Sequence, residues 1–371
     1  MSSKFFKLTG ALALALTVSF LAACDESDIP GGDGGTAAIA GATSEVVDSV
    51  MDEFFNDNEA LNSLDGLGGF IAGITGSQSI VPFGAAPSGD VWGSRQGMMD
   101  VNDALIERFR SRPSGDLYIT NIPSALLGAT CIWDVAQTAY VDDPTQTNAP
   151  ANGIRFILYT IDQSTFLPVD PLDDIGHIDI IDLSGTSSID VDIVAVVSGM
   201  TLVDYGVNGS WSDVDQTFNL DMSGFLSNGS DQLNFTWNAT GTATSFSQSY
   251  SIDFGPISVS MDTDYSATMS TTTWVITDDS NGDEIRIVFG MNEQTGDLLS
   301  GSGVWFNGTQ VAEFQGSNFE FNLVPTEGSP LTNNDLALLT VAAFTLEFEL
   351  LFALEELFFF ALSLTGTGVG I

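Results

Sequence analysis

The sequence is poor in basic residues. Its 371 residues include eight lysines and arginines against 49 aspartates and glutamates, and the formal net charge at pH 7 is -41. Nucleic-acid-binding proteins draw most of their affinity from lysine and arginine contacts to phosphate, so this function class is excluded. Docking on an anionic membrane through a basic patch is excluded for the same reason. The acidic residues are spread along the chain, which favours a solvated surface kept soluble by self-repulsion.

Cysteine and histidine are also scarce, and this limits the available chemistry. The two cysteines, Cys24 and Cys131, cannot build a framework of several disulfides. The single histidine, His177, has no second histidine or nearby cysteine with which to hold zinc or form a catalytic dyad. Nucleophile-elbow, zinc-protease, Walker and dinucleotide-binding motifs are absent from the sequence. We therefore expect a non-catalytic protein without cofactors, and a carboxylate-based hydrolase is the remaining catalytic alternative.

The N-terminus has the features of an export signal. Two lysines precede an apolar run from Leu8 to Ala23, and Cys24 follows directly. The run is short for a membrane-spanning helix, which needs about 20 residues, and acidic residues come close behind it. The motif Leu21-Ala22-Ala23-Cys24 resembles the lipobox of bacterial lipoprotein precursors. The resemblance implies that residues 1–23 are a signal peptide removed on export and that Cys24 becomes the lipid-bearing N-terminus.

The resemblance also implies a location in the cell envelope, with the lipid on Cys24 holding the protein to a membrane. Asp25 directly after the cysteine is a hint of retention in the inner membrane, but the choice between the inner and outer membrane stays open. Since both lysines precede Cys24, the mature protein has six arginines and no lysine.

A tether and a helical region are predicted before the main domain. Residues 24–43 are rich in glycine, aspartate and alanine and have no periodicity, which is typical of a flexible tether. Residues 44–112 contain two patterns of helical spacing, one beginning near Ser44 and one from Met99 to about Arg110. Pro113 ends the second pattern.

Residues 113–330 change from a helical period to a period of two. Apolar residues recur at every second position over 218–222, 233–237, 250–254, 257–261 and 285–289, and the residues between them are mostly Asp, Asn, Ser, Thr, Gln or Arg. The Asn-Gly pairs 208–209, 228–229, 281–282 and 307–308 favour tight hairpin turns between such runs. The predicted fold is mainly β (α+β): a long antiparallel meander forming a curved sheet or open barrel, with helices packed on it. A sandwich stays open as an alternative.

Residues 335–364 form a long apolar stretch that predicts one C-terminal helix. Glu347, Glu349, Glu355 and Glu356 interrupt it and make a bilayer span costly. Interfacial membrane helices usually carry lysine or arginine, and this stretch carries neither. We expect the helix to cover the apolar face of the sheet; contact with another protomer and shallow membrane insertion are the alternatives, and the oligomeric state stays open.

One loop is rich in oxygen ligands. Asp279, Asn281 and Asp283 are weak candidates to hold calcium, but the spacing of a calcium-binding loop is missing and a solvated hairpin turn is the preferred interpretation. Asp170, Asp173 and Asp174 are a second calcium candidate on the same weak grounds, and no catalytic residue is predicted.

The expected architecture over roughly residues 44–362 loosely resembles the half-barrel lipoprotein carriers and their lipid-binding relatives, without a shared motif. The resemblance implies a lipid-anchored, non-catalytic envelope protein that encloses a hydrophobic ligand, a lipid or an acyl chain, between sheet and helix. The alternative is a structural or adhesive surface domain with a filled core. The identity of any ligand stays open.

Overall fold

The structure is a computed structural model. It describes residues 125–162, 167–185, 188–212, 217–242, 244–317 and 320–329, together with Phe54, Asn58, Ala60, Leu61, Ile122, Leu331 and Leu357. In chain order the strands are β1 (Thr130–Asp134), β2 (Ala139–Asp142), β3 (Gly153–Tyr159), β4 (Ile161–Asp162), β5 (Leu167–Pro168), β6 (Asp174–Asp182), β7 (Ser188–Val197), β8 (Met200–Ser212), β9 (Thr217–Ser227), β10 (Gln232–Gly241), β11 (Ser245–Phe254), β12 (Ile257–Ser266), β13 (Met269–Asp278), β14 (Asp283–Asn292), β15 (Gly303–Phe306), β16 (Thr309–Ser317) and β17 (Glu320–Pro325).

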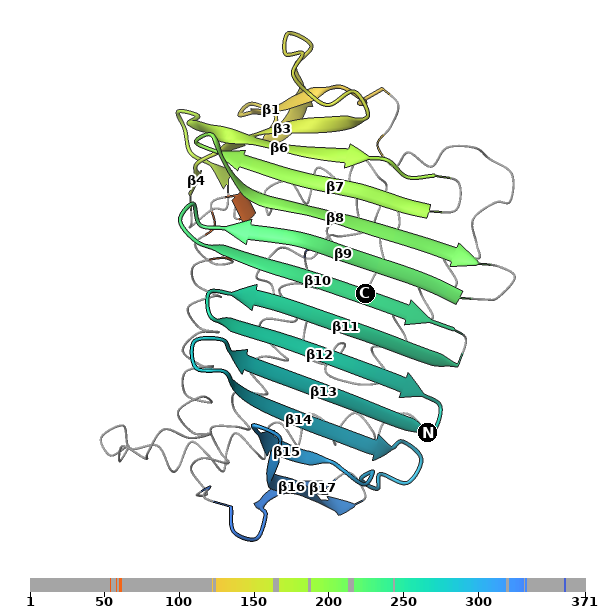
Figure 1. Cartoon of the computed structure of the whole chain (residues 1–371). Coiled ribbons are helices and arrows are strands. Elements are labelled where there is room, and N and C mark those ends of the chain that lie inside the picture. Colours follow the sequence, from red (N-terminus) through yellow and green to blue (C-terminus); the bar gives the residue numbers. More distant parts are fainter. Residues whose placement is uncertain are drawn as a thin grey trace.

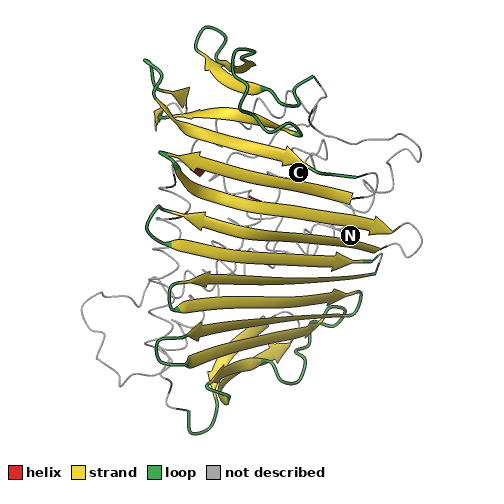
Figure 2. Ribbon diagram, turned by 45° about the horizontal axis from the view of Figure 1, so that its top comes forward, coloured by secondary structure: helices red, strands yellow, loops and turns green. Residues whose placement is uncertain are grey.

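Fifteen of these strands form one sheet, which Figure 1 shows as a ladder with the chain running from one end to the other. From β6 to β17 each strand pairs with the next in sequence, and beyond β6 the order continues β3-β1-β2. All pairs are antiparallel except β1 with β3. The sheet does not close on itself, and Figure 2 shows that β15–β17 bend away from the plane of the long strands. The predicted long antiparallel meander in a curved sheet is confirmed.

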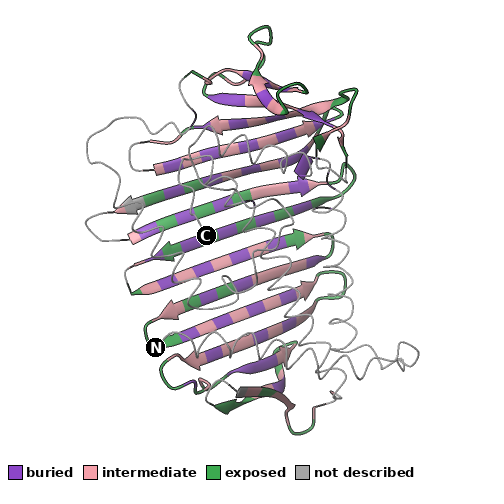
Figure 3. Cartoon of the chain, turned by 180° about the vertical axis from the view of Figure 1, so that it is seen from behind, coloured by how far each residue is buried: buried purple, intermediate pink, exposed green. Residues whose placement is uncertain are grey.

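The two faces of the sheet differ in chemistry because side chains alternate along each strand. In β10, Leu233, Phe235, Trp237 and Ala239 are buried, whereas every residue between them is polar and exposed. Figure 3 shows the same alternation of buried residues with more exposed ones along β7–β14. We call the two sides the buried face and the polar face. The alternation predicted at 218–222, 233–237, 250–254, 257–261 and 285–289 is confirmed, since these runs lie in β9, β10, β11, β12 and β14.

Three of the four Asn-Gly pairs make hairpin turns as predicted. The pairs 228–229, 281–282 and 307–308 join β9 to β10, β13 to β14 and β15 to β16. Gly229 and Gly282 have positive φ, and in the third turn both Asn307 (φ 48) and Gly308 (φ 78) do. Two consecutive residues with positive φ define the two-residue hairpin turn that asparagine and glycine favour.

The prediction of a turn at Asn208-Gly209 is wrong, because both residues lie within β8. Asn208 is exposed on the polar face, and Gly209 is on the buried face. A methyl group at Gly209 would lie 2.7 Å from Cδ2 of Leu220, the residue that pairs with it on β9. The glycine therefore makes room for a neighbouring core side chain and does not turn the chain.

Residues far from the sheet in sequence contribute to its buried face. Phe54 packs edge-to-face on Phe254 of β11, with ring centroids 5.0 Å apart. Asn58 is buried; its side-chain oxygen accepts hydrogen bonds from the backbone N–H groups of Ala60 and Leu61, and its amide donates to the carbonyl of Ser227 at 3.4 Å. This is the hydrogen-bonding pattern of a helix N-cap, and it fixes this part of the chain to the end of β9.

The C-terminal stretch reaches the same face at Leu357. Leu357 is fully buried in the core, and its carbonyl accepts a hydrogen bond of 3.1 Å from the Tyr205 hydroxyl. Burial raises the pKa of Tyr205 well above its usual range, so this phenol stays protonated and can donate. The helices predicted within 44–112 and 335–364 otherwise lie outside the described residues, as do the signal peptide and the tether.

Candidate functional site

The broadest candidate surface is the buried face of the long strands. Strands of ten residues are about 33 Å long and neighbouring strands lie about 4.8 Å apart, so β6–β14 form a surface of roughly 33 by 40 Å. Its side chains are mainly Ile, Val, Leu, Phe and Trp and belong to one continuous core. A surface of this size and composition can bury long hydrocarbon chains as well as segments of the protein itself.

One row across this face is polar. Gln248 of β11 pairs with Thr263 of β12, which pairs with Thr272 of β13, and the three side chains are 5%, 2% and 9% exposed. We call these three residues the buried polar row. Thr263 and Thr272 are joined by a 3.2 Å hydrogen bond between their hydroxyls, and the Tyr250 hydroxyl donates to the Gln248 side-chain oxygen at 3.3 Å. Buried polar groups persist in cores where they hold a partner or position a ligand.

The described neighbours of the buried polar row on the sheet are uncharged. Its neighbours on the same face are apolar, aromatic or hydroxyl-bearing: Ala239, Phe246, Tyr250, Met261, Tyr265, Ser270, Trp274 and Phe289. The indole N–H of Trp274 is buried and meets no hydrogen-bond acceptor within the described part of the chain. An indole nitrogen is a donor only, so this group is suited to an oxygen acceptor from elsewhere.

The buried polar row was not predicted, although the sequence contains a signal for it. Thr263 follows Ile257, Val259 and Met261 at the same spacing of two, and Thr272 precedes Trp274 in the same way. Each threonine therefore interrupts an apolar alternation at a position that the pattern assigns to the buried face. The pairing of the strands makes these three interruptions neighbours, and the alternation within each strand does not specify that pairing.

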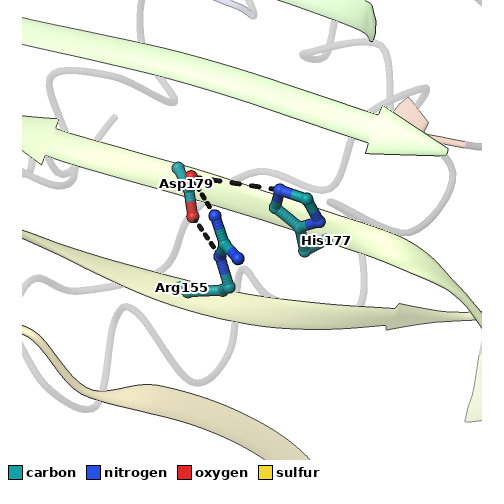
Figure 4. Close-up of polar contacts among 3 residues, drawn as sticks. All are labelled: Arg155, His177 and Asp179. Carbon is teal, nitrogen blue, oxygen red and sulfur yellow. Dashed lines mark hydrogen bonds and ion pairs between the residues drawn. The ribbon is translucent and has the colours of Figure 1, made fainter. Parts of the chain in front are cut away.

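A second group of interest is the contact between Arg155, His177 and Asp179 on the polar face, which Figure 4 shows in close-up. Arg155 of β3 donates two hydrogen bonds of 2.7 Å, from Nε and Nη2, to the two carboxylate oxygens of Asp179 on β6. Nε2 of His177 lies 4.0 Å from the same carboxylate. The side chains of Arg155 and Asp179 are 18% and 15% exposed, so the ion pair is partly shielded from water.

This group joins strands and has little catalytic character. Burial and the Arg155 charge lower the pKa of His177, which is consequently neutral at pH 7. The residues that pair with His177 on the neighbouring strands are Ile157 and Val196, neither of which is a nucleophile. A bidentate arginine–carboxylate pair fixes the register of β3 and β6, and we assign it that structural role.

Three aspartates lie close together on the polar face of β7 and β8. Burial is the main cause that raises the pKa of Asp190, Asp192 and Asp204. The charge of Asp192 raises the pKa of Asp190 further, and the charge of Asp204 does the same for Asp192. Asp192 leans over Gly206, whose missing side chain leaves room for its carboxylate. Among the described residues, no group of three or more His, Cys, Asp or Glu side chains is placed to hold a metal ion.

We expect Asp192→Asn to stabilise the protein at pH 7 by up to about 1 kcal/mol, because the amide avoids both the burial of a carboxylate and its repulsion by Asp204, and water screens these costs at a partly hydrated surface. A carboxyl group whose pKa is raised on folding favours the folded state at low pH, and this contribution is lost as the pH rises through the folded pKa. The gain should therefore shrink as the pH falls toward 3.8, the ordinary value, and be small at pH 3.5, where Asp192 is mostly protonated in both states. Urea unfolding at pH 7 and pH 3.5 measures the gain in the free energy of unfolding, and the variant Asp221→Asn, at an exposed aspartate, is the control. An equal gain at both pH values would contradict the explanation.

The first calcium candidates lie in the hairpin between β13 and β14. The side-chain oxygen of Asn281 accepts a 2.8 Å hydrogen bond from the backbone N–H of Asp283. The carboxylate of Asp283 accepts a 2.8 Å hydrogen bond from the Asn307 amide of the neighbouring turn, and the backbone N–H of Asp279 donates to a carbonyl. Hydrogen bonds of this kind are typical of asparagine and aspartate in hairpin turns, which is the interpretation preferred from the sequence.

The structure describes one of the two cysteines, Cys131. Cys24 lies outside the described residues, so its lipidation stays a prediction. Cys131 is buried in β1 as a free thiol, and burial together with the charge of Asp142 raises its pKa to about 12. Because a thiolate is the reactive form, Cys131 is an inert core residue at neutral pH.

Comparisons with protein-family models, curated proteins and solved structures find no match to this chain. No helix with the length and hydropathy of a membrane span occurs in the described part of the chain. The class of protein is therefore defined by the fold alone: a large open antiparallel sheet with one buried apolar face and one polar face.

Proposed function

We propose that this protein is a non-catalytic lipoprotein of the cell envelope that holds a hydrophobic ligand, a lipid or an acyl chain, against the buried face of its sheet. The lipobox at Leu21-Ala22-Ala23-Cys24 supports export and attachment to a membrane through a lipid on Cys24. The observation that carries the proposal is the continuous apolar surface of the long strands, with Leu357 of the C-terminal stretch packed on it.

A specific observation also favours a second function, that of a structural or adhesive domain with a filled core. Tyr205, Phe235 and Leu357 are buried by the chain itself, without any other molecule. A carrier exchanges such contacts for contacts with its ligand, whereas a structural domain keeps them permanently. The two functions differ in whether the purified protein takes up lipid.

The experiment is to compare native and denaturing mass spectra of the mature lipoprotein purified in mild detergent. Covalent lipid on Cys24 contributes to both masses, so the difference between them is the mass of non-covalent ligand. We expect extra mass that organic extraction recovers as lipid. A native mass equal to the denatured mass, with no uptake of added lipid, would exclude the carrier function and leave the structural one.

A further inference from the structure

We infer that the ligand on the buried face carries an uncharged oxygen acceptor, as in a neutral acyl ester such as a diacylglycerol, and that Gln248, Thr263, Thr272 and Trp274 bind this polar part. This inference rests on the proposed function and adds the chemical class of the ligand and the place of its polar group.

The first argument is the position of the buried polar row. Its three residues occupy places where the alternation of β11–β13 calls for apolar side chains, and all are at least nine-tenths buried. A buried polar group that lacks a partner costs about 1–3 kcal/mol, whereas an apolar group of the same shape costs nothing comparable. The row offsets part of this cost itself, because Thr263 donates to Thr272 and Gln248 accepts from Tyr250. We attribute its remaining hydrogen-bonding capacity to a guest.

The second argument is hydrogen-bonding capacity. Trp274 is 92% buried, and its indole N–H has no hydrogen-bond acceptor within the described residues. It lies on the same face as Thr272, two residues further along β13. A hydroxyl group can donate one hydrogen bond and accept two, and a glutamine amide can donate two, so the row offers donors to an ester carbonyl and both donors and acceptors to a hydroxyl.

The third argument is charge. Among the described residues, the neighbours of the row on the buried face include no lysine, arginine or histidine, and the whole chain has a net charge of -41. A carboxylate or phosphate placed there would be buried without a counter-ion, at a cost of several kcal/mol. The polar part of the ligand is therefore neutral. The adjoining rows, which include Met261 and then Val259 and Ile276, offer apolar contacts to its chains.

The test is a titration of the mature lipoprotein with dioleoylglycerol and with oleate at pH 8, followed by native mass spectrometry. These probes share the acyl chain and differ in the charge of the polar part. We expect dioleoylglycerol to bind at least about tenfold more tightly, because the carboxylate of oleate meets no cation among the residues of this face that the structure describes.

Thr272→Val nearly keeps the shape of the side chain and removes its hydroxyl, and Trp274→Phe keeps an aromatic ring at the site but removes the indole N–H together with part of the ring system. Each is expected to weaken dioleoylglycerol binding about fivefold, the effect of one neutral hydrogen bond, with little change for oleate. Thr273→Val is the matched control: it is the next residue of β13, it faces the other side of the sheet, and it should bind like the parent. Circular dichroism of each variant checks folding, and Trp274→Phe keeps the test open if Thr272→Val is unstable.

The outcomes separate the inference from the proposed function. Equal affinity for both probes, or variants that bind dioleoylglycerol like the parent, would overturn the inference while the carrier function stands. Uptake of neither probe by the parent would overturn the carrier function and the inference with it.

Discussion

Replacing Gly224 by alanine is expected to destabilise the fold by about 3 kcal/mol or more, or to prevent folding. Gly224 of β9 lies on the buried face and pairs with Tyr205 of β8 and Phe235 of β10. A methyl group there would lie 2.2 Å from the carbonyl oxygen of Asp204 and 2.4 Å from Cβ of Tyr205. Because these atoms belong to or are next to the backbone, relief requires β8 and β9 to move apart.

The glycine also explains how two large rings fit on β8 and β10, the two strands that flank β9. Tyr205 and Phe235 lie with ring centroids 6.2 Å apart, on either side of the space that Gly224 leaves open. Closing that space would disturb the Tyr205 ring, whose hydroxyl binds Leu357. The effect should therefore spread from the sheet to the C-terminal stretch.

Urea unfolding followed by circular dichroism measures the change, and Gly206→Ala is the matched control. Gly206 lies on the polar face of β8, where the nearest atom to an added methyl group is Oδ1 of Asp192 at 2.8 Å. A carboxylate at the end of a side chain can rotate away, so this variant should stay within about 1 kcal/mol of the parent. An unfolding midpoint for Gly224→Ala equal to that of the parent would contradict the close approach of β8 and β9.

Replacing Cys24 by serine is expected to abolish lipid attachment completely. Diacylglyceryl transfer in lipoprotein precursors forms a thioether with the cysteine of the lipobox, and a serine hydroxyl does not substitute for the thiol. Cells that express the protein and are fed a radiolabelled fatty acid should label the parent and leave the Cys24→Ser variant unlabelled. The variant should also leave the membrane fraction, since the lipid on Cys24 is the proposed anchor.

Cys131→Ala provides the control for this experiment. Cys131 is the one other cysteine of the sequence, and its thiol is buried and neutral at pH 7. Label on this variant should equal that of the parent. Label that persists in Cys24→Ser and is lost in Cys131→Ala would contradict the lipobox assignment.

Much of the fold could be predicted from residue patterns. The alternation at Leu233, Phe235 and Trp237 identifies a strand and its buried side at once, because a period of two is compatible with one backbone conformation. Asn307-Gly308 identifies a hairpin turn because few other residues adopt positive φ at both positions. These signals are local, and local backbone sterics decide them.

Other features could not be predicted, for a physical reason. Asn208-Gly209 has the same local signal as Asn307-Gly308 yet lies inside a strand, since packing against Leu220 decides its conformation. Arg155 and Asp179 are 24 residues apart in sequence and meet because β3 pairs with β6. Pairing energies between distant segments are sums over many contacts, which a residue pattern does not contain.

The sequence by itself determined the acidic composition, the predicted lipid anchor at Cys24 and the two-faced character of the strands, because composition and periodicity act residue by residue. Tertiary structure alone decided that the sheet stays open and that β15–β17 bend away from it. It also placed Gln248, Thr263 and Thr272 side by side within an apolar surface. Register decided this last feature, since a shift of one residue in any of the three strands would turn its polar side chain to the other face.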